Sequence, residues 1–189
     1  NELKEISQHV VEVARSAGAD DVVAEAIVTE VKQVRFSNSQ VDAVNSWSEE
    51  HLALLVAIGK KVISSDIRTL TDLDPHARAL VSLAKKVPPS KTYEGVAPGR
   101  FKYRRNPVDG MIVKLRDPSR FVHEAIAGAE GFGANNVGGT FYAIHERVGL
   151  ASSGGAVGAD ESTAADLSVR AFSQPEASGH AVCCTPTLT

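Results

Sequence analysis

The sequence predicts an α+β fold of mixed, mostly antiparallel sheets packed with about three helices, and two observations favour it. Segments with helical spacing of apolar residues alternate with Val- and Ile-rich segments separated by Gly and Asx turns. A short pattern at residues 16–28 recurs at 131–143, which indicates a duplicated helix-plus-four-strand unit. We therefore expect a first α+β unit at 1–87, a Pro/Gly-rich basic linker at 88–116 and a second α+β unit at 117–189.

The three expected helices have recognisable starts or ends. Apolar residues recur at helical spacing from Leu3 to Ala17, and Gly18 follows where a left-handed cap would lie. The other two helices each begin at an Asp-Pro pair, Asp74-Pro75 and Asp117-Pro118. In both pairs Asp suits the N-cap and Pro the first helical position.

The strands are predicted from apolar alternation and from bounding turn residues. The first half is expected to hold a long strand at 21–36 and separate strands at 41–47, 51–58 and 61–67. Residues 145–147, His-Glu-Arg, are interpreted as a hairpin turn in the second half. The strands expected around that turn are 136–145, 148–152, 163–173 and 179–186.

The repeat rests on one local match at an offset of 115 residues, Gly18-Ala19-Asp20-Asp21-Val22 against Gly133-Ala134-Asn135-Asn136-Val137. Glycine permits the positive φ of a sharp reversal, and Asp or Asn bonds its local backbone. The match therefore reflects either common ancestry or common turn chemistry, and both interpretations stay open.

Composition excludes some classes of protein. With 43% hydrophobic residues, 23% charged residues and a net charge of −3, the chain lacks the basic character of a general nucleic-acid binder. The basic-aromatic cluster from Lys102 to Arg105 is better explained as part of a solvated linker than as a nucleic-acid site. No apolar run approaches the roughly 20 residues that span a bilayer, and no signal-peptide core opens the chain, so we expect no membrane partner and a cytoplasmic location.

Metal ligands are sought first at His123-Glu124, which begins a His-Glu-x-x-His pattern on the third predicted helix. Ala127 stands where the second His is required, so we expect His123 to be a partly exposed helix residue. His180 lies near Cys183, but two donors do not make a zinc site. The adjacent Cys183 and Cys184 are expected to remain thiols. We assign no metal ligand and no catalytic residue to this chain.

Longer stretches carry a family resemblance. The segment "FVHEAIAGAEGFGANNVGGTFYAIHERVGLASSGG", followed by "ESTAADLSVRAFSQPEASGHAV", resembles the N-terminal domain of the TldD/PmbA family, long described as modulators of DNA gyrase. The segments "AGADDVVAEAIV" and "VRFSNSQVDAVNSWSEEHLALLVAIGKKV" agree with it. The resemblance covers nearly the whole chain through weak patterns rather than one diagnostic motif.

This resemblance implies a proteolytic system. TldD-type members are zinc-dependent proteases with a His-Glu-x-x-x-His helix in a C-terminal domain, and PmbA-type members are partners that lack it. The N-terminal domain of the family helps to form a closed chamber and offers β-strand surface to an extended peptide. This chain has no His-Glu-x-x-x-His, so the resemblance implies zinc in an absent C-terminal domain or in a partner subunit. It also implies a homodimer, or a heterodimer with another TldD/PmbA-type subunit.

On this resemblance, residues 166–180, "DLSVRAFSQPEASGH", are the candidate peptide-facing edge. An unpaired strand edge holds a peptide through main-chain hydrogen bonds that do not depend on sequence. The candidate substrate-binding residues are Arg170, Ser178, Gly179 and His180. Arg170 also fits a simpler interpretation as the polar face of an alternating strand.

Two other functions remain open. One is a non-catalytic binding module that modulates DNA gyrase or another partner. The other is a self-contained hydrolase, for which the sequence offers no Gly-x-Ser-x-Gly elbow. Whether the parent protein is a metallopeptidase or its inactive partner is not decided by these residues.

Overall fold

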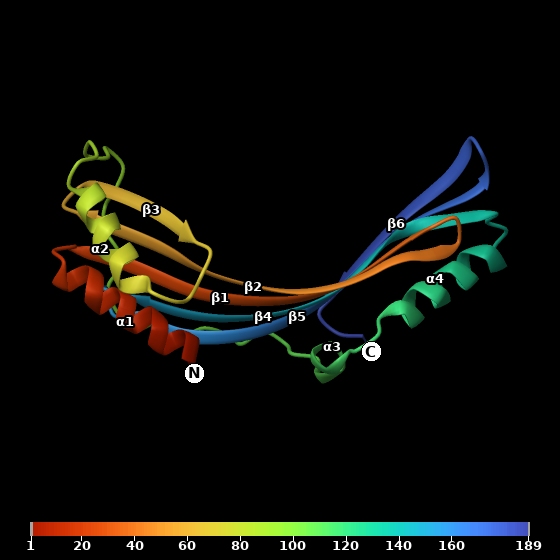
Figure 1. Ribbon diagram of the computed structural model, residues 1–189, viewed down its shortest axis with the longest axis horizontal. Helices are drawn as coiled ribbons and strands as arrows, with labels where there is room; N and C mark the ends of the chain where they lie inside the picture. Colours follow the sequence, from red (N-terminus) through yellow and green to blue (C-terminus); the bar gives the residue numbers. More distant parts are fainter. Residues whose placement is uncertain (1, 189) are drawn as a thin grey trace. The chain divides into compact units, whose positions relative to one another are not determined.

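The computed structural model describes residues 2–188, and Figure 1 shows their helices and strands in chain order. The helices are α1 (Glu2–Ser16), α2 (Leu73–Ala84), α3 (Gly110–Lys114) and α4 (Ser119–Gly131). The strands are β1 (Asp21–Ser37), β2 (Gln40–Ile58), β3 (Lys61–Ile67), β4 (Asn136–Ser152), β5 (Val157–Gln174) and β6 (Ala177–Thr185). No helix in this part of the chain is long and apolar enough to cross a membrane.

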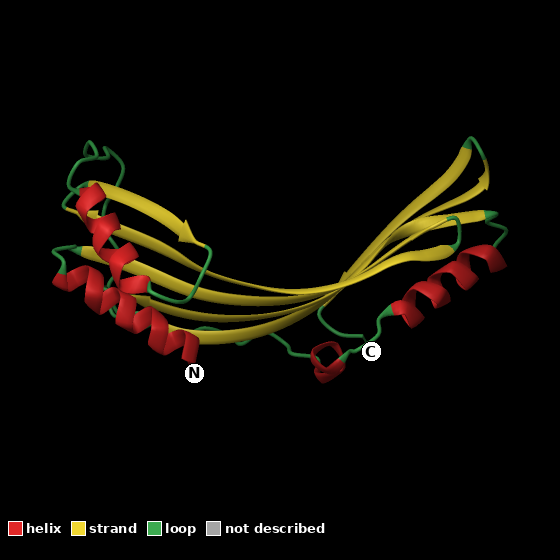
Figure 2. Cartoon of the chain, viewed as in Figure 1, coloured by secondary structure: helices red, strands yellow, loops and turns green. Residues whose placement is uncertain are grey.

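The strands form one hydrogen-bonded sheet in the order β3-β2-β1-β4-β5-β6. The outer pairs, β2 with β3 and β5 with β6, are antiparallel. Figure 2 shows the strands in yellow and the helices in red. The predicted α+β class is confirmed.

The described chain divides into two compact units built from interleaved segments. Unit 1 contains residues 2–28, 49–105 and 147–160, and unit 2 contains the remaining described residues. Each long strand contributes one part to unit 1 and another to unit 2, because β1, β2, β4 and β5 all contain a boundary between them. The division at 88–116 that the sequence suggests stays a prediction about folding units.

In unit 1, α1 and α2 pack together over one face of the strands, where they bury an aliphatic core. Alternate residues of β1 point into this core, as period-2 geometry requires. The core residues from the two helices and from β1, β2 and β4 include Val10, Ala14, Val22, Ala24, Leu52, Leu54, Leu80, Val81 and Ala151.

One polar side chain ties α1 directly to two strands. The hydroxyl of Ser7 is fully buried, donates to the carbonyl of Gly149 at 2.8 Å and accepts from the backbone N–H of Ala26 at 3.1 Å. A Cβ atom at Gly149 would overlap the backbone of Leu3 and Lys4. The missing side chain at residue 149 therefore lets α1 lie against β4.

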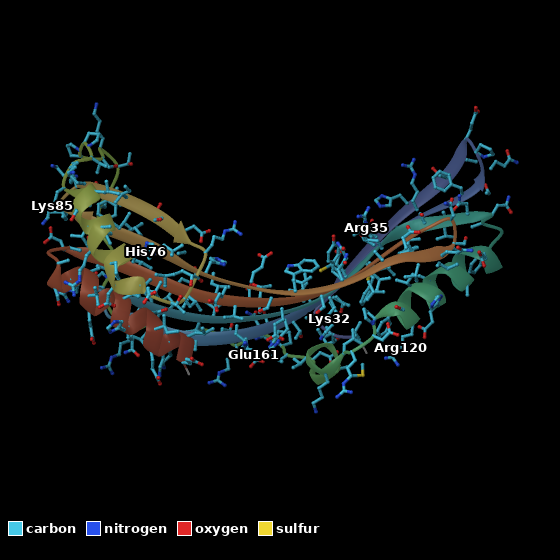
Figure 3. The ribbon with its side chains drawn as sticks, viewed as in Figure 1. Lys32, Arg35, His76, Lys85, Arg120 and Glu161 are labelled. Atoms are coloured by element: carbon cyan, nitrogen blue, oxygen red, sulfur yellow. The ribbon has the colours of Figure 1, made fainter. Side chains whose placement is uncertain are left out.

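In unit 2, α4 covers one face of β1, β4 and β5, with help from α3. The rings of Phe121 on α4 and Phe141 on β4 stack with centroids 5.3 Å apart. The other buried residues of this core are Val34, Phe36, Ile112, Val122, Ile126, Val137, Ala143 and Ala165. Residues that alternate with them on the strands face the other side, and Figure 3 shows Arg35 projecting away from the side where α4 and Arg120 lie.

The predicted repeat is reproduced in the two turns that follow α1 and α4. Gly18 and Gly133 both have positive φ, +103° and +92°, and both follow a helix that the chain leaves to start a strand. The backbone hydrogen bonds of the two turns are equivalent at the offset of 115. In the first turn the N–H groups of Gly18, Ala19 and Asp20 donate to the carbonyls of Arg15, Ala14 and Ala57. In the second turn the N–H groups of Gly133, Ala134 and Asn135 donate to the carbonyls of Glu130, Ala129 and Phe172.

Both α1 and α4 are followed by three strands rather than the four that the sequence suggested. The predicted strands 41–47 and 51–58 join as β2, and 136–145 and 148–152 join as β4. The interpretation of 145–147 as a hairpin turn was wrong, because β4 continues through it with His145 buried. Polar residues inside a long strand resemble a turn in sequence, although the ladder continues.

The predicted first residues of α2 and α4 were correct within two positions, but the N-cap residues predicted for them were wrong. The helix α2 begins at Leu73, and the Asp74 carboxylate bonds the His9 imidazole at 2.7 Å instead of capping. Before α4, Asp117 accepts from the N–H of Ser119 at 2.9 Å, although Pro118 is the N-cap residue. The short helix α3 was missed because it lies within the Pro/Gly-rich segment 88–116.

Unit 1 fixes the first part of that Pro/Gly-rich segment at several points. The N–H of Ser90 bonds the carbonyl of Lys60 at 2.7 Å, and the N–H of Gly99 bonds the carbonyl of Gly154 at 2.8 Å. The Tyr93 hydroxyl donates to Asp21 at 2.9 Å. Burial, followed by this hydrogen bond and the charge of Asp21, raises the pKa of Tyr93 to about 12.

Two glycines should respond oppositely to alanine. Gly149→Ala should lower the free energy of unfolding by about 1–3 kcal/mol, because the new methyl group overlaps the backbone of α1. Gly128→Ala should raise it by about 1 kcal/mol, because Gly128 is exposed inside α4 and its Cβ would meet no atom within 4 Å. Chemical denaturation measures both changes, and a Gly149→Ala variant as stable as the parent would contradict the close packing.

The Tyr93 contact should make stability depend on pH in the alkaline range. Its folded-state pKa of about 12 exceeds the unfolded value of 10.0, so the contribution is complete below pH 10.0 and is lost as the pH rises towards about 12. Tyr93→Phe should remove this dependence and the phenolate step near pH 12 from an ultraviolet titration. An alkaline titration curve that keeps this step in Tyr93→Phe would refute the assignment.

Candidate functional site

Strand β6 lies at one end of the sheet order, and no further strand pairs with it among residues 2–188. Its residues from Ala177 to Cys184 are exposed, and only Thr185 is half-buried. Figure 1 shows β6 at the border of the unit 2 strands. One side of its backbone therefore presents N–H and C=O groups that no strand of the described chain satisfies.

The composition of β6 is unusual for an exposed edge. Its nine residues, "ASGHAVCCT", include no Lys, Arg, Asp, Glu or Pro. The strand at the other end of the sheet order, β3, carries Lys61 and Asp66. Charges and prolines on an edge discourage pairing with another chain, so β6 lacks the usual protection against strand addition.

The structure brings the predicted site residues together on β5 and β6. Arg170 lies directly opposite His180 in the antiparallel register, while Ser178 and Gly179 pair with the two residues that follow Arg170. The Arg170 Nε and Nη2 atoms both donate to the Ser178 hydroxyl at 3.2 Å. His180 Nε2 lies 2.9 Å from the Ser168 hydroxyl.

Alternation along the strands divides the predicted site between two faces. Leu167 and Val169 pack against the core of unit 2, so Arg170, with Ser178 and His180 beside it, faces away from α4. We call the side that carries Ser168, Arg170, Ser178 and His180 the Arg170 face; Phe172 and Val182 point to the same side. Gly179 belongs to the opposite face. Whether these residues contact a peptide stays a prediction.

The Arg170 guanidinium forms no ion pair with a carboxylate within residues 2–188. Its bonded partner there is the neutral Ser178 hydroxyl, and it also lies 5.5 Å from the centre of the Phe172 ring. Arginine has five N–H donors in a planar fork, so further donors remain for a carboxylate or carbonyl group.

The opposite face of the hairpin carries a pocket of about 390 Å³. It lies between the C-terminal end of α4 and the turn from β5 to β6, with Ala129, Phe132, Ala171 and Gly179 in its wall. Phe132 is 97% exposed, although it is among the largest apolar side chains of the protein. A Cβ at Gly179 would meet no atom within 4 Å. We call this space the Phe132 pocket.

Zinc does not fit the donor set of the described chain. No three His, Cys, Asp or Glu residues lie close enough in residues 2–188 to hold a metal ion. His123 is exposed on α4, as predicted, and Glu124 beside it is exposed too. No chemical step through a metal is derived for this chain.

Sequence reasoning missed a buried histidine between two carboxylates. His145 Nε2 lies 2.7 Å from Glu161 on β5, and its Nδ1 lies 3.6 Å from Glu30 on β1. Nδ1 has no hydrogen-bond partner among the described residues. Figure 3 shows Glu161 on the same side of the strands as Arg120 of α4. The signal was alternation, because His145 follows the buried Phe141 and Ala143 at period 2.

Both cysteines of β6 are exposed free thiols. Successive strand residues point to opposite faces, so Cys183 and Cys184 cannot join in a disulfide without distortion of β6. In the native protein, 5,5′-dithiobis(2-nitrobenzoate) should therefore titrate both thiols, and Cys183→Ser and Cys184→Ser should each remove one. A thiol that reacts only after denaturation would show that β6 is covered.

No protein-family model and no curated protein matches the sequence. Solved structures do match in fold. A proposed modulator of DNA gyrase from Bacteroides thetaiotaomicron superposes with a TM-score of 0.80 at 16% identity, over 100% of this chain and 46% of that one. TldE from Thermococcus kodakarensis gives 0.75 at 13% identity, over 95% of this chain and 42% of that one.

A second proposed modulator of DNA gyrase, from Thermotoga maritima, gives a TM-score of 0.74 at 14% identity, over 97% of this chain and 43% of that one. The chain thus spans less than half the length of each of these three structures. The chain has the fold found in part of these proteins, and the TldD/PmbA resemblance inferred from the sequence is confirmed at the level of the fold.

Proposed function

We propose that this chain is the substrate-shaping, N-terminal domain of a TldD/PmbA-type protein and holds an extended peptide for proteolysis. The fold shared with TldE and with the two proposed gyrase modulators supports the family assignment. The sequence resemblance supports the N-terminal position. Peptide cleavage itself would take place at a zinc site in a domain outside this chain or in a partner subunit.

The observation that carries the proposal is the unprotected edge of β6. An exposed strand without charges or proline is a hazard for a soluble protein unless it has a partner. An added peptide strand would satisfy the free N–H and C=O groups with main-chain hydrogen bonds. Main-chain bonds are the same for every sequence, which suits a domain that must hold varied substrates.

The contribution of this domain would be conformational rather than chemical. A protease needs its substrate extended, and a free peptide loses about 1–2 kcal/mol of backbone entropy per residue when it is fixed. The hydrogen bonds formed when the peptide adds to the edge of β6 would offset this entropy loss, and they form away from the bond that is cleaved. On this proposal the protein is cytoplasmic and forms a homodimer, or a heterodimer with a TldD/PmbA-type subunit.

A binding module that acts on DNA gyrase is the second candidate function. It draws on the descriptions of two structural neighbours. The net charge of −3 gives no support to direct contact with DNA. A protein target would remain compatible with the β6 edge, because strand addition does not distinguish a substrate from a partner.

Proline substitutions in β6 test the proposal in the full-length protein. In an antiparallel ladder, alternate residues direct their N–H towards the neighbouring strand, so one of Ala181 and Val182 directs its N–H outward. Proline at the outward position should keep the fold and weaken binding of fluorescein-labelled β-casein, an unstructured polypeptide, at least tenfold. Anisotropy measures binding, and circular dichroism identifies the variant that stays folded.

Two further variants keep the result interpretable. Val182→Glu adds a charge at an exposed side chain and should also weaken binding without loss of fold. Ser64→Pro, in the charged edge strand β3, is the matched control and should leave affinity for casein unchanged. Unchanged affinity in a folded proline variant of β6 would overturn the proposed function.

A further inference from the structure

We propose that the β6 edge selects peptides with an acidic–apolar–acidic pattern, with the apolar residue in the Phe132 pocket and the acidic residues over the Arg170 face. This inference rests on the proposed function, because it assumes that a peptide adds to β6 as a strand. It goes further by naming the side chains that the edge prefers. The two faces of the β5–β6 hairpin differ in charge and shape, and this difference carries the inference.

The Arg170 face is suited to carboxylates. Arg170 is exposed and its bonded side-chain partner in the described chain is a neutral hydroxyl, while His180 lies directly opposite on β6. Asp166 shares this face but lies four residues along β5, about 13 Å away at 3.3 Å per residue. Glu176 lies in the turn, and neither carboxylate pairs with Arg170. A ligand carboxylate would therefore meet an unneutralised guanidinium.

The Phe132 pocket can take one apolar side chain against Phe132 and Ala171, beside the hydroxyl-bearing residues Ser173 and Ser178. Its volume of about 390 Å³ exceeds what any single aliphatic side chain needs, and the absence of a side chain at Gly179 keeps it open towards β6. Phe132 at its wall is 97% exposed, so its ring gains the most from being covered by a ligand. Burial of an exposed aromatic ring is a common source of binding energy at interfaces.

Strand geometry places the preferred apolar residue and the preferred acidic residues at adjacent positions of the bound peptide. Successive residues of an added strand point to opposite faces. A peptide residue beside Gly179 would point to the Phe132 pocket. Its two neighbours, beside Ser178 and His180, would point to the Arg170 face. The preferred sequence is therefore an apolar residue flanked on both sides by Asp or Glu.

Three labelled heptapeptides test this preference in the full-length protein. The probes are Ser-Thr-Glu-Leu-Glu-Thr-Ser, the same peptide with both Glu replaced by Lys, and the same peptide with Leu replaced by Ser. Fluorescence anisotropy should show the first peptide binding about tenfold more tightly than each of the others. The preference for Glu over Lys should shrink as salt is added, whereas the preference for Leu over Ser should persist.

Matched variants assign each preference to its face. Arg170→Gln should abolish the preference for Glu over Lys and keep that for Leu over Ser. Gly179→Val fills the pocket at a residue without positive φ, and should abolish the preference for Leu and keep that for Glu. Arg120→Gln removes an equal charge from α4, on the other side of the unit 2 strands, and should change neither preference.

The outcomes separate this inference from the proposed function. Equal binding of all three peptides, lost together in the folded proline variant of β6, would overturn the sequence preference and keep the docking edge. Binding unaffected by that proline would overturn the docking edge itself. Dimerisation through β6 that labelled peptide cannot displace, seen by sedimentation, would show that a second copy of this chain occupies the edge and would overturn both.

Discussion

Burial of one face of the strands beneath helices is the constraint on which the other features of each unit depend. In unit 1, α1 and α2 supply the covering layer, and in unit 2 α4 supplies it with α3. A helix can cover a strand only if the chain reverses sharply between them, which the positive φ of Gly18 and Gly133 allows. Close contact also requires small residues, and Gly149 beneath α1 is the clearest case.

Because the helices cover only one face of the strands, the other face and the edge strands are available to bind a ligand. In unit 2 the uncovered side carries Arg170, Ser178 and His180, together with the apolar Phe172 and Val182. The edge strand β6 has neither charge nor proline, and its residues from Ala177 to Cys184 are exposed. A surface of this kind suits a binding role better than catalysis, because it offers hydrogen-bond partners along a line rather than convergent groups in a cleft.

The candidate site shows how far sequence reasoning reaches. The family resemblance nominated residues 166–180, with Arg170 and His180 among them, and alternation alone only placed Arg170 on the polar face of a strand. It could not show that the two lie opposite each other, because register depends on where the β5–β6 turn falls. His145 was misplaced for a related reason: a turn and a polar stretch of a long strand have similar composition, and only the ladder distinguishes them.

The sequence by itself determined the α+β class, the approximate bounds of the three long helices and the Gly-Ala-Asx turns of the repeat, because these depend on local spacing and backbone chemistry. Only the tertiary structure decided that β1 and β4 lie side by side, that β6 is an edge, and that Phe132 stands exposed beside a pocket. Those features arise from pairing between residues far apart in the chain. No local pattern encodes which strand will find which neighbour.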